Sequence, residues 1–149
     1  MKLNNEPSTE NIMNTQNENG HMLLFSGNEW YKKLSREEVQ NVINQAQAWF
    51  DQLNATGKIK GGQPLARRGA IVSGKNGRVV TDGPFAESKE AIGGYLLLNV
   101  ETMEEAVAIA RTNPALAYGT SIEVRPVAEE CPLDALARES KPQEQFANA

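Results

Sequence analysis

Residues 35–57, SREEVQNVINQAQAWFDQLNATG, carry the clearest helix signal in the chain. Ser35 and Glu38 have the S-x-x-E spacing of a capping box, in which each side chain accepts a hydrogen bond from the other residue's backbone N–H. Gly57 suits the position just past a helix C-terminus. The segment therefore predicts an amphipathic helix, whose apolar face consists of Val39, Val42, Ile43, Ala46, Trp49, Phe50 and Leu53.

Short apolar runs on both sides of this helix predict β-strands. The dipeptide Asn76-Gly77 separates two β-branched runs, which is a strong hairpin signal because both residues tolerate φ > 0. A second helix is expected to begin at Thr102 and to stop at Asn113-Pro114. The order of elements is that of an α+β fold, a ferredoxin-like split βαβ with an inserted β-hairpin. Its expected strands are residues 21–25, 59–65, 70–73, 78–81, 95–100 and 120–127.

Composition divides the 149-residue chain into one domain and two tails. Residues 1–19 are rich in Asn, Glu, Thr and Gln, so we expect a flexible N-terminal extension that cannot repay its ordering entropy. Residues 20–127 form the expected ordered domain, and residues 128–149 form a C-terminal tail. Leu133 and Leu136 predict a short helical turn in this tail that docks on the core.

Charge and residue counts exclude several classes of function. The net charge of −4 argues against direct nucleic-acid binding, and we expect Arg67-Arg68 to be a solvated strand end. A single cysteine and a single histidine, His21, argue against a metal site, and no motif indicates a cofactor. His21 is expected to have a surface role. The sequence shows no membrane span and no signal peptide, so a cytoplasmic location is expected.

The expected sheet has one face that its two helices cannot cover. Alternation in residues 120–127 places Glu123 and Arg125 together on this far face, and alternation in residues 95–100 adds Tyr95 and Leu97. This mixture of aromatic, aliphatic and charged side chains is too apolar to face open solvent and too polar to form a sealed core. We therefore expect a homodimer, in which two sheets enclose a polar inter-subunit cavity; the alternative is a monomer with a half-solvated sheet.

The connection 81–94 is the most distinctive part of the sequence. It contains Asp82-Gly83-Pro84-Phe85-Ala86-Glu87-Ser88-Lys89-Glu90 and ends in Gly93-Gly94-Tyr95, and Glu123-Val124-Arg125-Pro126-Val127 follows later. With these motifs, residues 21–127 closely resemble the DGPF-type branch of the YCII-related family. The resemblance implies a dimeric α+β barrel of ferredoxin-like topology.

The resemblance implies less about activity. Some YCII relatives are regarded as lyase-type or dehalogenating enzymes with a His-Asp pair in the cavity, and DGPF relatives also occur beside extracytoplasmic-function sigma factors. This chain has no histidine in the helix where YCII-type relatives carry theirs, and Asn113 stands where some relatives have Asp before Pro. The His-Asp chemistry therefore does not carry over. A role as an accessory to sigma-factor regulation rests on the family association alone.

Two functions of different classes remain open. The first is a homodimeric small-molecule-binding or protein-interaction module without a cofactor. The second is a cofactor-free lyase- or isomerase-like enzyme that uses Asp82 as acid or base on a small anionic or aromatic substrate. Asp82 also suits a purely structural role in its turn. The expected ligand-binding residues are Pro84, Phe85, Tyr95, Glu123 and Arg125.

Overall fold

A computed structural model describes residue 13 and residues 17–27, 29–84 and 91–140. The elements, in chain order, are β1 (His21–Ser26), the 3-10 helix η1 (Trp30–Lys33), α2 (Arg36–Ala55), β2 (Ile59–Pro64), β3 (Arg68–Ser73), the 3-10 helix η2 (Lys75–Gly77), β4 (Val79–Pro84), β5 (Gly94–Leu98), α3 (Met103–Ala110), the 3-10 helix η4 (Pro114–Tyr118), β6 (Ser121–Pro126) and α4 (Pro132–Ser140).

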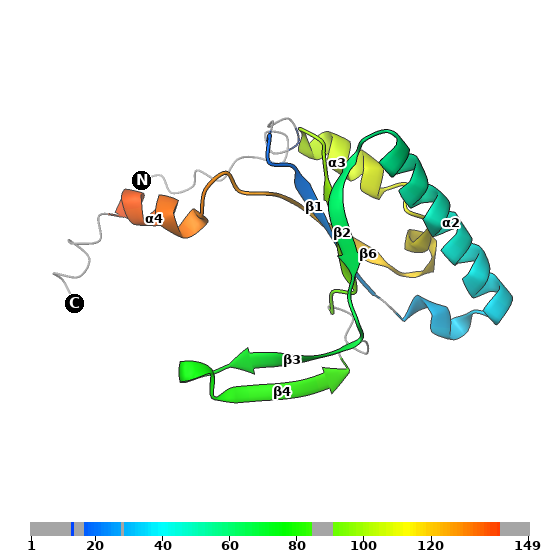
Figure 1. Cartoon of the computed structure of the whole chain (residues 1–149), viewed down its shortest axis with the longest axis horizontal. Coiled ribbons are helices and arrows are strands. Elements are labelled where there is room, and N and C mark those ends of the chain that lie inside the picture. The colour runs from blue at the N-terminus through cyan, green and yellow to red at the C-terminus, as the bar shows by residue number, and fades with distance from the viewer. Residues whose placement is uncertain (1–12, 14–16, 28, 85–90, 141–149) are drawn as a thin grey trace.

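The main sheet has four antiparallel strands in the order β2-β5-β1-β6. In both β1-α2-β2 and β5-α3-β6 another strand lies between the two that the helix connects, which is the split βαβ arrangement. The mixed α+β fold is therefore confirmed and is compatible with a ferredoxin-like topology. The helices α2 and α3 lie on the same side of the sheet (Figure 1).

The predicted capping box of α2 is confirmed. Ser35 Oγ accepts a hydrogen bond from the Glu38 N–H at 3.1 Å, and the Ser35 N–H donates to Glu38 Oε1 at 2.8 Å. Gly57 follows the helix with φ +72°, a backbone conformation that favours glycine. The predicted apolar face needs one correction: Ile43 is 47% exposed, because only a narrower stripe of α2 faces the sheet.

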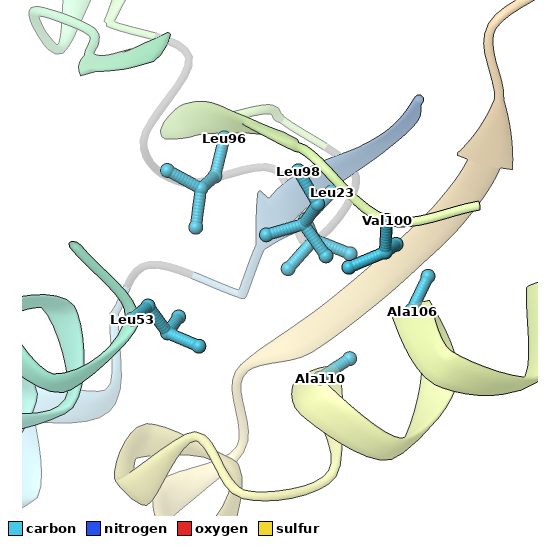
Figure 2. Packing of buried hydrophobic residues seen from close by; sticks show 7 residues of the cluster. All are labelled: Leu23, Leu53, Leu96, Leu98, Val100, Ala106 and Ala110. Carbon is cyan, nitrogen blue, oxygen red and sulfur yellow. The ribbon is translucent and has the colours of Figure 1, made fainter. Parts of the chain in front are cut away.

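The hydrophobic core lies between the main sheet and its two helices. Leu23 of β1 and Leu96 and Leu98 of β5 point toward the helices, and apolar residues of the helical layer meet them (Figure 2). Ile122 and Val124 of β6 pack against this cluster, as their alternation predicted. The remaining buried members of the cluster are Leu53, Val100, Ala106 and Ala110.

Two residues at the start of the domain depart from expectation. His21 is buried, and its Nδ1 lies 3.1 Å from the Val100 carbonyl oxygen, so the predicted surface role was wrong. It shares the helix-facing side of β1 with Leu23, which alternation along the strand requires. Asn17 lies before the expected boundary at residue 20 but is buried, and its side-chain amide donates to the Val127 carbonyl oxygen at 2.6 Å.

Two elements project from the main sheet on the side opposite to α2 and α3: the β3–β4 hairpin and α4 (Figure 1). Asn76 and Gly77 both have positive φ, as the hairpin prediction required, although they lie within η2 and not in a two-residue turn. The helix expected in the C-terminal tail forms as α4, but its expected docking on the core was wrong. Leu133 and Leu136 are exposed because α4 lies away from the core.

The capping box generates a pH-dependent prediction. Hydrogen bonds from the Ser35 backbone and side chain lower the pKa of the Glu38 carboxyl from 4.5. A lowered pKa in the folded state stabilises the protein above the unfolded-state pKa, and this contribution is lost as pH falls through the folded-state value. Urea unfolding should therefore show wild type losing stability relative to Glu38→Gln below pH 4.5. If the difference in unfolding free energy between wild type and Glu38→Gln does not change below pH 4.5, the prediction is contradicted. The control is Glu37→Gln, which lies outside the capping box.

Neighbouring glycines in β2 supply a matched pair of variants. A methyl group at Gly62 would lie 2.6 Å from the Tyr95 carbonyl oxygen, whereas one at Gly61 would meet nothing within 4 Å. We predict that Gly62→Ala destabilises the protein by about 1–3 kcal/mol through overpacking. Gly61→Ala should change stability by less than about 0.5 kcal/mol. If both variants unfold at the same denaturant concentration, the close approach of the Tyr95 carbonyl oxygen to position 62 is refuted.

Candidate functional site

The far face of the main sheet carries two cross-strand rows of side chains. Strand register places Tyr95 beside Leu24, and Leu24 beside Glu123. The second row places Leu97 beside Met22, and Met22 beside Arg125. The apolar members of both rows are half-buried, while the charged members are exposed. Within the described part of the chain this face thus has an apolar centre and a charged edge on β6.

Glu123 and Arg125 pair with each other along β6. Arg125 Nε lies 3.8 Å from Glu123 Oε2, and both side chains are more than half exposed. An exposed pair at this distance contributes little to stability, because water and salt screen the attraction. The guanidinium is not engaged in any tighter interaction among the described residues, so it is accessible to an anion approaching the edge of the far face.

Of the three residues predicted from the connection 81–94, the two that the structure describes lie on the hairpin strand β4. Asp82 lies on β4, opposite Ala70 of β3, and is exposed. Pro84 is the last residue of β4, and Phe85 lies outside the described residues. Within the described chain, Asp82 therefore lies on the hairpin and not beside Tyr95, Glu123 or Arg125.

A cleft of about 620 Å³ lies on the helix-facing side of the sheet. Its walls come from β1, β2 and β5, from α2, and from the segments that include η1 and η4. Apolar and aromatic side chains dominate it. We call this cavity the α2 cleft; its main apolar residues are Phe25, Trp30, Ala46, Phe50, Ile59 and Leu96.

Asn113 supplies the α2 cleft with a buried polar group. It is 8% exposed, and its Oδ1 accepts a hydrogen bond from the Ala115 N–H at 2.8 Å, which caps η4. Its Nδ2 has no hydrogen-bond partner among the described residues. No described side-chain nitrogen or oxygen is both buried and unpaired, so Asn113 Nδ2 is accessible from the cleft and can donate to a ligand acceptor. Thr120 adds a hydroxyl to the same lining.

Sequence reasoning missed the α2 cleft as a site. Of the predicted ligand-binding residues that the structure describes, only Tyr95 lines it, next to Gly94 on β5. Trp49 and Phe50 were interpreted as core residues, yet Phe50 lines the cleft and stacks edge-on against Trp49 at a centroid separation of 5.1 Å. The one sequence signal for this site was Asn113, which stands directly before Pro114, where some YCII relatives have Asp.

Arg67 forms the wall of a smaller hollow of about 240 Å³ beside the root of the hairpin. Its guanidinium carbon lies 4.6 Å from the centre of the Tyr31 ring, a cation–π contact. Arg67 is exposed and directly precedes β3, as expected for a solvated strand end, and its side chain also covers an aromatic face. This contact ties the start of the hairpin to η1.

No group of three or more His, Cys, Asp or Glu side chains is placed to hold a metal ion in the part of the chain that the structure describes. None of the described helices combines the length and apolar character that crossing a membrane requires.

Comparison with known proteins identifies the family. The sequence model of the YCII-related domain matches residues 12–130. The chain belongs to the YCII-related family. The chain is also similar to an uncharacterized protein of Rhizobium meliloti (strain 1021), with 28% identity over 102 residues that cover 66% of this chain and 80% of the relative. Membership of the DGPF-type branch stays a prediction from the motif at Asp82–Glu90.

Proposed function

We propose that this YCII-related protein is a homodimeric module that binds a small molecule in the α2 cleft. The observation that carries the proposal is the cleft itself, an aromatic-lined cavity of about 620 Å³ with an accessible amide donor at Asn113. Ligand sites in proteins are typically cavities of about 300–1,000 Å³, mostly apolar, with a few placed polar groups. The α2 cleft has each of these properties.

The lining favours a flat apolar ligand that carries a hydrogen-bond acceptor. Phe25, Trp30 and Phe50 provide aromatic surface for a ring. Asn113 Nδ2 can donate to a carbonyl or a similar oxygen on that ring, because Asn113 Oδ1 is already used by the Ala115 N–H. We therefore expect neutral or weakly polar aromatic compounds to bind in preference to highly charged ones.

The same lining favours binding over catalysis. Among the described residues of the α2 cleft, none carries a carboxyl, imidazole, thiol or amine. Tyr95 is its one titratable member, and alternation along β5 directs that side chain toward the far face. The proposed enzyme alternative would need Asp82, which is exposed on β4, to be brought to a bound substrate from elsewhere.

The far face supports the homodimer part of the proposal. Its half-buried centre of Met22, Leu24, Tyr95 and Leu97 is apolar and uncovered among the described residues. Two copies packing these faces together would bury that surface and form a dimeric α+β barrel. The exposed pair of Glu123 and Arg125 would then lie at the edge of the dimer interface, where both side chains would line the proposed polar inter-subunit cavity.

A conservative change at Asn113 tests the ligand site. Asn113→Asp keeps an oxygen for the Ala115 N–H and removes the amide donor, and its carboxylate would repel an acceptor oxygen. In a thermal-shift screen of small aromatic carbonyl compounds, we expect wild type to be stabilised by compounds that lose at least about tenfold in affinity for the variant. The control is Asn44→Asp, an exposed change on α2. No stabilising compound, or equal affinity in all three proteins, would refute the site.

A charge on the far face tests the dimer. Leu97 lies at the centre of that face, between Met22 and Gly61 of the neighbouring strands. Leu97→Arg should weaken association by about 2 kcal/mol or more, because it buries an unpaired cation at the centre of an interface. Light scattering over a dilution series measures the change. A wild-type mass of 16.3 kDa at micromolar concentration would exclude the dimer.

A further inference from the structure

The β3–β4 hairpin forms a separate arm. We define the arm as Arg68–Pro84, which comprises β3, η2 and β4. Its two strands pair only with each other, in a two-stranded sheet of their own. Every residue from Arg68 to Asp82 is exposed in the described subunit. Figure 1 shows the arm extending away from the main sheet.

Each face of the arm carries exposed β-branched apolar side chains. Strand register puts Ile71 and Val79 on one face, with exposures of 51% and 49%. Val72 and Val80 form a directly opposed pair on the other face, with exposures of 64% and 61%. A two-stranded hairpin is at best marginally stable in water unless an apolar face is packed against something else. The arm therefore needs a surface to cover at least one of its faces.

The root of the arm is held in place. The Leu65 N–H donates to the Gly93 carbonyl oxygen at 2.9 Å, and the Gly93 N–H donates to the Phe25 carbonyl oxygen at 2.7 Å. The stacking of Arg67 on Tyr31 adds a side-chain contact at the same point. These contacts join the arm to β1 and η1, so its direction is set by the domain and not by a free linker.

That direction and the charge of the arm both point to a second copy of this chain. The arm projects to the side of the sheet on which the far face is uncovered (Figure 1), so a copy seated on that face would lie within its reach. The arm carries Arg68, Lys75 and Arg78 against one carboxylate, Asp82, whereas the whole chain has a net charge of −4. The rest of the chain therefore carries a net charge of −6, which favours association of the basic arm with a second copy.

We propose that the arm of each subunit packs against the partner copy through its Val72–Val80 face and so stabilises the dimer. We call this contact the clasp. This inference rests on the homodimer proposed above and adds a second contact to it. Two-fold symmetry allows both arms to be used at once, which doubles the buried apolar surface. A nucleic acid is a poorer occupant, because phosphates would leave both valine-bearing faces in water.

Shape-preserving polar variants test the clasp. Val72→Thr combined with Val80→Thr keeps β-branched side chains and strand propensity but introduces hydroxyls on the proposed contact face. We expect the dimer dissociation constant, from light scattering and sedimentation over a dilution series, to rise about tenfold or more. The matched control is Ile43→Thr on α2, at a site 47% exposed, which should leave the constant unchanged.

Hydrogen exchange separates the outcomes. Backbone amides of β3 and β4 should be protected in wild type at high protein concentration and exchange faster on dilution, in step with dissociation. A dimer unaffected by the threonine pair would overturn the clasp while leaving the far-face dimer intact. Amides that are protected equally at all concentrations would mean that the chain covers its own arm, which also overturns it. A monomeric wild type would overturn both the clasp and the far-face proposal.

Discussion

The described part of the chain buries only one face of its main sheet, and most of the other structural features depend on this constraint. Two helices, α2 and α3, supply enough apolar surface to cover the side on which Leu23, Leu96 and Leu98 lie. Alternation along each strand then sends an equal number of side chains to the other side. The uncovered far face, with its apolar centre and charged edge, is the direct consequence.

The α2 cleft exists because small residues meet at one end of this layer. Gly62 and Gly94 on adjacent strands, and Ala46 on α2, leave space that larger side chains would fill. Glycine at position 62 is required by the close approach of the Tyr95 carbonyl oxygen, so the absence of a side chain there is part of the sheet. Aromatic rings from Phe25 and Phe50 then border the space. The missing side chain at Gly62 thus both allows the strands to pack closely and leaves space for the cavity.

The described residues of the motif in the connection 81–94, Asp82 and Pro84, are not among those that line this cavity. Asp82 and Pro84 belong to β4, at the end of the arm that joins the domain, and Phe85 lies outside the described residues. A motif in a connection indicates a shared local structure, but it does not indicate which surface it faces. Only register and strand order show that Asp82 opposes Ala70, far in the topology from Glu123 on β6.

Local signals in the sequence determined the elements: the Ser35–Glu38 capping box, the hairpin at Asn76-Gly77 and the alternation that separates Ile122 and Val124 from Glu123 and Arg125. Each depends on residues close together in the chain, so their physics is visible without a fold. Tertiary structure alone decided the burial of His21 and the exposure of Ile43 and of α4. It also decided that Asn113, Phe25 and Phe50 line the same cleft. These outcomes depend on which segments pack together, and contacts between distant residues leave no periodic trace in the sequence.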